Sequence, residues 1–322
     1  MKRKYVPYLF FTVFFIAAFI WDLYDYRVKK NIYLPANSRQ DYKIVALPLP
    51  DTLSFAGEPV PIDLFYVKEG LEKELSVNTY WHSSTLQLIR KSSRWFPLID
   101  SILEADSIPF DFRYLPLIES NLSNVKSPAG AVGFWQLMKG TAKDYGLEVN
   151  REVDERYDVK KSTEAACRYL KKSYGKLGNW TLVAASYNAG IKRITTLMEK
   201  QRSSNFYDLL VPTETNRYIY RILAIKMIIN NPEDYSFYLE DQDYYKPLPY
   251  HVIKVEGKID DWAVFAQEHG ISYRLLKIYN PWLRQPYLTN RKHRTYEIKI
   301  PEPPYNITAE KIFDEWEFEN PN

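Results

Sequence analysis

Side chains that could do chemistry are concentrated in two segments of this chain, residues 117–137 and residues 185–190. Together they combine one carboxylic acid in apolar surroundings with neutral side chains that donate and accept hydrogen bonds. The side chains concerned are Glu119, Ser127, Gln136, Tyr187 and Asn188. A carboxyl group that follows Leu117 and Ile118 loses hydration, so its pKa rises and it can stay protonated near neutral pH. This combination predicts a general acid that protonates the bridging oxygen of a bound sugar polymer.

Helices must position these groups, because the surrounding sequence has helical periodicity. Apolar residues recur at helix-like intervals between residues 77 and 105, and two Gly and one Pro predict a loop over residues 127–133. Further helices are expected over residues 112–120, 135–145, 162–177, 180–188 and 213–230. No strand pattern interrupts them, so we predict a mainly α domain over residues 76–240.

A smaller unit with a different pattern follows, over residues 250–302. Alternating apolar residues predict strands at 252–255 and 296–300, and amphipathic patterns predict helices at 260–269 and 273–279. The predicted order of elements is therefore βααβ. Residues 303–322 are expected to form a tail beyond this unit.

The N-terminus carries a membrane signal. Basic residues at positions 2–4 precede an apolar run over residues 5–21, and no clear cleavage site follows the run. Positive charge on the leading side favours an N-terminus in the cytoplasm. We therefore expect residues 1–22 to be an uncleaved anchor in the inner membrane, rather than a cleaved signal peptide, with the rest of the chain facing the periplasm. Residues 22–61 are rich in Pro, Asn and charge, residues 63–76 have no clear pattern, and residues 23–75 are expected to be an extracytoplasmic linker.

Composition argues against several other classes of function. The 43 Lys and Arg residues nearly balance the 40 Asp and Glu residues, and no basic stripe is present, so nucleic-acid binding is not expected. Cys167 is the only cysteine, and the four His residues are far apart in the sequence. We therefore expect no internal disulfide, no metal site and no cofactor.

Four motifs, in order along the chain, carry a resemblance to a known family. They are Glu119-Ser120, the run from Ser127-Pro128-Ala129-Gly130 to Gly133-Phe134-Trp135-Gln136, Tyr187-Asn188-Ala189-Gly190, and Glu214-Thr215-Asn216-Arg217-Tyr218. Residues 114–220 resemble the catalytic domain of lytic transglycosylases of the soluble-lytic-transglycosylase type, and most of all the D-type subgroup of the membrane-bound enzymes. The resemblance implies a lysozyme-like helical fold. It also implies non-hydrolytic cleavage of the β-1,4 bond between MurNAc and GlcNAc in peptidoglycan, which leaves a 1,6-anhydro-MurNAc end.

The resemblance also implies a role for each motif residue. Glu119 would act first as acid and then as base, with the substrate's own N-acetyl group in place of a second enzyme carboxylate. The residues that correspond to substrate-contacting or supporting positions are Ser127, Gln136, Tyr187, Asn188 and Glu214. Ser127 as an ordinary loop residue and Glu214 as a helix-start residue favoured by the helix dipole are explanations that hold equally well.

The βααβ unit resembles a LysM module, which binds glycans containing GlcNAc. Its turn, Gly257-Lys258-Ile259-Asp260, departs from the usual Gly-Asp-Thr-Leu, and the segment over residues 282–294 is longer and more basic than expected. We therefore expect the module to keep its fold, while glycan binding and a purely structural role are both open.

Two alternatives to a lytic transglycosylase remain at this point. A muramidase would use the same fold and the same Glu119 but would let water attack C1 of the sugar. A non-catalytic wall-binding protein would use the helical domain and the LysM-like module for adhesion alone. The presence of Glu119, Gln136 and Tyr187 together argues against this second alternative.

Overall fold

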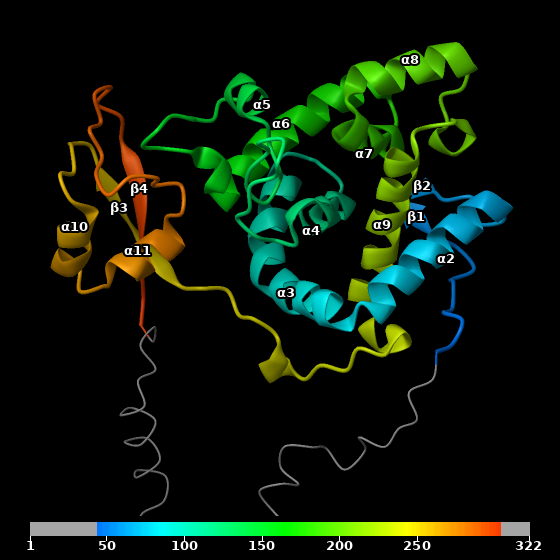
Figure 1. Ribbon diagram of the computed structural model, residues 1–322, viewed down its shortest axis with the longest axis horizontal. Coiled ribbons are helices and arrows are strands. Elements are labelled where there is room, and N and C mark those ends of the chain that lie inside the picture. Colours follow the sequence, from blue (N-terminus) through cyan, green and yellow to red (C-terminus); the bar gives the residue numbers. More distant parts are fainter. Residues whose placement is uncertain (1–43, 304–322) are drawn as a thin grey trace, which may run out of the picture. The chain divides into compact units, whose positions relative to one another are not determined.

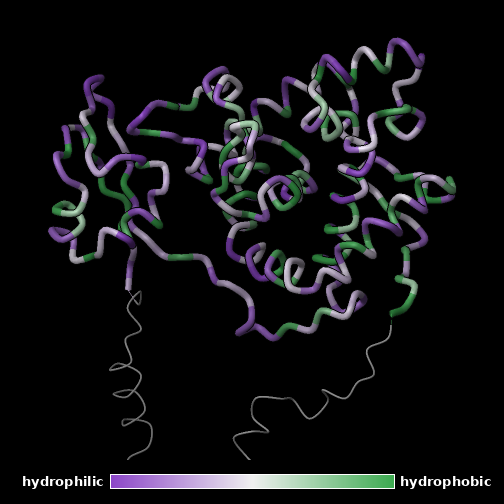
Figure 2. Tube along the Cα trace, in the orientation of Figure 1, coloured by the Kyte–Doolittle hydropathy of each residue, from purple (hydrophilic) through white to green (hydrophobic). Residues whose placement is uncertain are grey.

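The computed structural model describes residues 44–303 (Figure 1). The anchor expected over residues 1–22 lies outside the described residues, and so does all but the first residue of the tail expected over residues 303–322. Within residues 44–303 no helix is both long and apolar enough to cross a membrane. Polar residues recur along the longer helices (Figure 2).

The larger part of the described chain is helical, as predicted. Its α-helices are α2 (Phe65–Tyr80), α3 (His82–Ala105), α4 (Leu115–Ser120), α5 (Lys139–Asp144), α6 (Val159–Leu177), α7 (Trp180–Ala189), α8 (Ile191–Gln201) and α9 (Thr213–Asn230). Short 3-10 turns lie between and after them, at Phe110–Tyr114, Glu155–Tyr157, Phe206–Asp208, Pro232–Tyr235 and Asp241–Asp243. Helix α2 packs along α9 and α3 packs along α6, while α7 contacts α6, α8 and α9.

Helix α7 is the apolar centre of this part of the molecule. Four consecutive residues, Leu182 to Ala185, are fully buried, so the helix is covered on all sides rather than on one face. Its first turn is capped twice. The Asn179 side chain accepts from Leu182 N at 2.8 Å, and the Glu58 carboxylate accepts from Trp180 N at 2.6 Å. The negative charge of Glu58 also suits the positive end of the helix dipole.

The helical part begins earlier in the chain than the sequence predicted. A small hairpin, β1 (Ser54–Phe55) and β2 (Glu58–Pro59), precedes α2, so residues 54–75 belong to the fold and not to a linker. Phe55 and Leu71 are buried in the core, and Glu58 holds the start of α7. These contacts join residues more than a hundred positions apart, so no local pattern indicates them.

Two further differences concern the helices after the acid motif. Residues 135–145 were expected to be one helix, but α5 begins only at Lys139 because residues 132–137 form a turn closed by a bridge between Val132 and Leu137. Helix α8 was not expected. It is amphipathic, and Ile194 is its one fully buried residue.

The smaller unit has the predicted βααβ order. Its elements are β3 (Tyr250–Val255), α10 (Trp262–Glu268), α11 (Tyr273–Tyr279) and β4 (Tyr296–Pro301). The strands are antiparallel, with Tyr250 opposite Pro301 and Val255 opposite Tyr296. Side chains of Trp262, Leu276 and Ile298 are fully buried and form a core separate from that of the helices.

The smaller unit is bound directly to a segment before α6. Asp154 N donates to Trp282 O at 2.9 Å, and Arg284 N donates to Glu152 O at 2.7 Å. The Val153 side chain between these bonds is 1% exposed and belongs to the core of the smaller unit. Residues 148–158 therefore form a junction that fixes the unit by backbone bonds and by burial.

Candidate active site

Glu119 lies in the last turn of α4. The apolar residues before it, Leu115 and Leu117, are fully buried and fix the short helix to the core. The helix ends at Asn121, whose φ of 53° is left-handed and whose N–H still bonds to Leu117 O at 3.0 Å. This sharp end keeps the Glu119 carboxyl at the end of a rigid, buried element.

The Glu119 carboxyl is withdrawn from water and has one hydrogen-bond partner. Tyr218 on α9 is 3% exposed, and its hydroxyl donates to Glu119 Oε1 at 2.7 Å. Burial raises the pKa of Glu119 to about 7, against the smaller lowering effects of the Tyr218 bond and of Arg221. The direction agrees with the prediction from the apolar sequence around Glu119.

Among the described residues, no cation forms an ion pair with Glu119. The nearest positive charge that affects it is Arg221, whose Nη2 donates to Ile118 O at 3.4 Å rather than to the carboxyl. Without an ion pair, the protonated form persists up to neutral pH. The carboxyl can therefore give up a proton and take one back over the range where most enzymes work.

Tyr187 on α7 supports the loop next to the acid. Its hydroxyl donates to Trp135 O at 2.6 Å, and its ring packs against Trp135 and Tyr169 with tilted, edge-like geometry. Burial raises its pKa well above the ordinary value, and the nearby Glu119 carboxyl raises it further. Tyr187 therefore lies close to Glu119, although its hydroxyl bonds to the loop backbone.

The loop that carries Gln136 is held in an unusual conformation. Gln136 has a left-handed φ of 46°, and its Nε2 donates to Gly133 O at 2.7 Å and to Val125 O at 3.2 Å. Gly133 has a φ of 80°, and a Cβ there would lie 2.0 Å from Arg156 O. Only glycine fits at this point, which explains the glycine that leads the motif.

Ser127 and Trp135 serve the same loop. The Ser127 Oγ accepts from Ala131 N at 3.0 Å, which closes the turn of the Ser-Pro-Ala-Gly motif. The Trp135 ring is fully buried, and its Nε1 donates to Thr163 Oγ1 at 2.8 Å. In this structure the Ser127 hydroxyl acts within the loop and makes no hydrogen bond with Glu119.

Asn188 and Glu214 meet beside the acid. The Asn188 Nδ2 donates to Glu214 Oε1 at 3.4 Å, and Thr215 Oγ1 donates to Asn188 Oδ1 at 3.0 Å. The charge of Glu214 contributes to the raised pKa of Glu119, so the two carboxyls are near each other. These bonds join the end of α7 to the first turn of α9.

The fold thus brings most of the predicted residues to one place. Glu119, Tyr187, Asn188 and Glu214 gather where α4, α7 and α9 meet, and the loop with Gln136 is tied to this group by Ser120, whose Oγ donates to Phe134 O at 2.9 Å. Tyr218 is part of the fourth sequence motif, but the sequence alone assigned it no role. Its position four residues after Glu214 puts both on one face of a helix, which is the signal that could have identified it.

Metal ligands are not gathered anywhere in residues 44–303: no group of three or more His, Cys, Asp or Glu side chains could hold an ion there.

Comparison with known families defines the class of protein. Residues 106–210 match the family model of the transglycosylase SLT domain, and residues 251–304 match that of the soluble lytic transglycosylase C-terminal LysM-like domain. The chain therefore contains a transglycosylase SLT domain followed by a LysM-like domain. The matched SLT segment ends before α9, so Glu214 and Tyr218 lie outside it.

A particular homologue can also be named. Over 220 residues the chain is 30% identical to membrane-bound lytic murein transglycosylase D of Escherichia coli strain K12, which covers 66% of this chain and 47% of the relative. The chain thus spans about half the length of this curated relative.

Two solved structures show similarity over part of the chain. The 70 kDa soluble lytic transglycosylase of Escherichia coli has a TM-score of 0.39 at 18% identity, over 55% of this chain and 33% of that one. Lytic transglycosylase Slt of Pseudomonas aeruginosa has a TM-score of 0.37 at 19% identity, over 47% and 26%.

Proposed function

We propose that this protein is a peptidoglycan lytic transglycosylase. It cleaves the β-1,4 bond between MurNAc and GlcNAc without water and leaves 1,6-anhydro-MurNAc ends. The SLT domain and the homology to a lytic murein transglycosylase support the class of reaction. The observation that carries the residue assignment is the Glu119 carboxyl, which is partly buried and has no ion-pair partner among the described residues, so that loss of hydration raises its pKa to about 7.

In the proposed reaction, Glu119 moves one proton in each direction. Its protonated carboxyl gives a proton to the bridging oxygen, and the bond from C1 to that oxygen breaks. The substrate's N-acetyl oxygen stabilises the electron-deficient C1. The Glu119 carboxylate then takes the proton of the C6 hydroxyl while the C6 oxygen bonds to C1. The enzyme ends in its starting state, and no water is consumed.

The neighbours of Glu119 suit a site with a single acting carboxyl. The other nearby carboxyl, Glu214, is hydrogen-bonded to Asn188 and lies in the first turn of α9. We assign Glu214 and Asn188 to support of the site. Ser127, Gln136 and Tyr187 shape the loop that faces the substrate, and we assign Gln136 and Tyr187 to its binding.

The protein is proposed to act in the cell envelope. The basic and apolar N-terminal sequence supports an anchor in the inner membrane over residues 1–22, with the domains facing the periplasm. The LysM-like domain is proposed to contact the glycan strand. The relative in Escherichia coli is named as a membrane-bound enzyme, which is consistent with this location.

The test is a digestion of purified peptidoglycan sacculi by the full chain in detergent, with product masses read by mass spectrometry. We expect products that are lighter by one water than hydrolytic muropeptides, because the C6 oxygen replaces water at C1. Hydrated reducing ends would assign a muramidase on the same fold. Absence of products, with the protein still sedimenting with the sacculi, would assign a wall-binding protein.

A further inference from the structure

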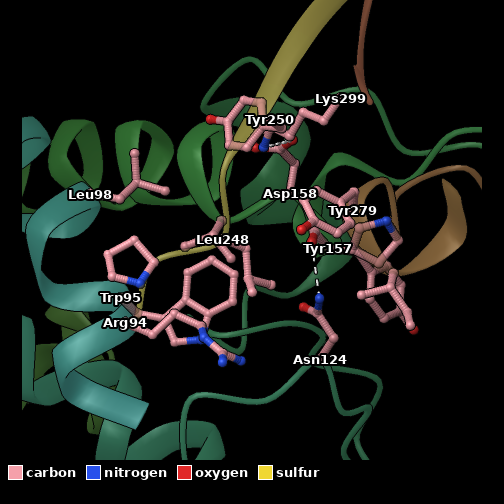
Figure 3. A pocket seen from close by; sticks show the side chains of 14 residues that line it. Arg94, Trp95, Leu98, Asn124, Tyr157, Asp158, Leu248, Tyr250, Tyr279 and Lys299 are labelled. Carbon is pink, nitrogen blue, oxygen red and sulfur yellow. Dashed lines mark hydrogen bonds and ion pairs between the residues drawn. The ribbon is translucent and has the colours of Figure 1, made fainter. Parts of the chain in front are cut away.

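A cavity of about 350 Å³, whose lining does not include Glu119, lies between α3, the segment before α6 and the LysM-like domain (Figure 3). Its walls are largely apolar. Trp95 and Leu98 of α3 form one side, and Tyr250 and Tyr279 of the LysM-like domain form another. The volume and the mixture of apolar walls with a few polar groups are typical of sites for small ligands.

The charged groups of the cavity have unused hydrogen-bond donors. The Arg94 Nε donates to Lys246 O at 2.9 Å, while its two Nη groups bond to no described residue. The Lys299 side chain is 16% exposed, and its Nζ has one hydrogen-bond partner, Asp158 Oδ2 at 3.2 Å, and lies 5.4 Å from the centre of the Tyr250 ring. In Figure 3 these two cations approach the cavity from different sides.

The one carboxylate of the cavity has its charge already engaged. Asp158 Oδ1 accepts from Lys161 N at 3.0 Å, in the cap of α6, and Oδ2 accepts from Lys299. The lining of the cavity thus holds two cations and one carboxylate, so its net charge is positive. A ligand that fits must bring acceptors and negative charge on an apolar body, because charge-assisted bonds to Arg and Lys are the strong ones available. A neutral sugar offers as many donors as acceptors and matches less well.

A series of contacts connects the cavity to the helix that carries Glu119. Trp95 packs edge-on against Phe134, with ring centroids 5.0 Å apart. The carbonyl of Phe134 accepts from Ser120 Oγ, and Ser120 follows Glu119 in α4. Trp95, which lines the cavity, and Phe134 therefore link the cavity to α4.

We propose that this cavity binds carboxylates of the short peptides attached to the glycan strand, so that the enzyme holds its substrate at a second point. The proposal rests on the proposed function, because it takes peptidoglycan as the substrate. It assigns Arg94 and Lys299, on different sides of the cavity, to carboxylates of the peptide and the ring of Trp95 to its apolar body.

Titration calorimetry with the full chain in detergent tests the proposal. The probes are a synthetic peptidoglycan stem tetrapeptide with free carboxylates and the same peptide with every carboxylate amidated. We expect the amidated peptide to bind at least tenfold more weakly, since it keeps the apolar body and loses the charge. Equal binding of the two peptides would overturn the proposal, as would no binding of either.

The chain offers a matched control for the arginine. Arg94 and Arg90 both bond to backbone carbonyls of residues 243–246 and both stack on Tyr245, at 5.0 and 4.7 Å, but only Arg94 lines the cavity. Arg94→Gln should weaken binding of the free peptide at least tenfold, and Arg90→Gln should leave it unchanged. Equal loss in both variants would mean that the contact with residues 243–246, and not the cavity, is what matters.

Two further measurements separate this proposal from others. A chitin trisaccharide that displaces the peptide would identify the cavity as a sugar site and overturn the assignment. A chain that ends at residue 303 and binds at least tenfold better than the full chain would identify the acidic segment 304–322 as the occupant, which also overturns it. Digestion of sacculi with the same preparations keeps the two failures distinct, because an active enzyme that binds no peptide leaves the proposed function standing.

Discussion

The Glu119 carboxyl and three carboxyls at the junction with the LysM-like domain are largely shielded from water, but their hydrogen-bond partners differ in charge. Three carboxyls of the junction each face a cation: Asp154 faces Arg156 at 2.8 Å, Asp158 faces Lys299 at 3.2 Å, and Glu148 faces Arg294 at 2.8 Å. Glu119 faces the neutral hydroxyl of Tyr218.

This difference separates a structural carboxyl from a reactive one. An ion pair favours the charged form, which holds two parts of a fold together but cannot supply a proton. Burial without a paired cation favours the neutral form, and the pKa of Glu119 rises to about 7. Loss of water thus accompanies a stabilising ion pair at the junction and a proton-donating acid at Glu119.

Replacing Glu119 should have the largest effect. Glu119→Gln keeps the shape and the bond to Tyr218 but removes the proton, and general acid–base catalysis accounts for about 10²–10⁴-fold in rate. We expect at least that loss in the rate of product release from sacculi. Glu148→Gln removes a paired carboxyl and should retain most of the activity. A comparable loss in both variants would erase the distinction between the two regions.

Breaking an ion pair at the junction should affect stability instead. Arg156 donates to both oxygens of Asp154 and also to Gly130 O and Leu137 O, and its side chain is 8% exposed. Arg156→Met leaves a buried charge, so we expect the free energy of unfolding to fall by about 3–5 kcal/mol. Urea unfolding at pH 7, followed by circular dichroism, measures it. The Arg294 side chain is 47% exposed and Glu148 keeps the bond from Tyr296, so Arg294→Met should lose less, about 1 kcal/mol.

The stability of the Glu119→Gln variant should depend on pH in a defined direction. Below about pH 4.5 Glu119 is protonated in both the folded and the unfolded chain, so the variant and the wild type should be equally stable. As pH rises from 4.5 to 7 only the unfolded chain ionises, which destabilises the wild type by roughly 3 kcal/mol once pH exceeds 7. Thermal or urea unfolding at pH 4 and pH 8 measures the difference. A constant difference between these pH values would be inconsistent with a raised pKa.

Removing the hydroxyl of Tyr218 should have the smallest effect, and it tests how this group influences Glu119. The bond from Tyr218 lowers the pKa of Glu119, so Tyr218→Phe should raise it and shift the falling limb of the pH–rate profile to higher pH. Tyr187→Phe removes a hydroxyl that bonds to Trp135 O and should leave the limb in place. The position of the limb, and not the size of the rate, is the measurement that a merely structural role would not change.

The sequence was sufficient to predict the features that depend on neighbouring residues alone. The apolar residues before Glu119 predicted a raised pKa, and periodicity predicted the helical part and the βααβ order. The left-handed Gln136 was missed, because Gly133 must pass against the backbone of Arg156 and that contact is not visible from periodicity. The helix expected over residues 135–145 therefore starts later, at Lys139.

Contacts between distant segments account for the other differences. The hairpin at residues 54–59 has only two residues in each strand and is held by Glu58 at the start of α7, more than a hundred residues away. The junction pairs join residues 148–158 to residues 294–299 in the same way. The charges within one segment do not indicate which residues of the other segment they pair with.

The protonation of Glu119 itself tests the central claim most directly. Carbon-13 labelled glutamate carboxyls in the full chain can be followed by NMR from pH 3 to pH 9, with the Glu119→Gln variant used to assign the signal. The structure predicts that the assigned signal titrates with a midpoint of about 7. A midpoint near 4.5, the ordinary value for glutamate, would contradict the account, because Glu119 would then be ionised at neutral pH and could not serve as the acid.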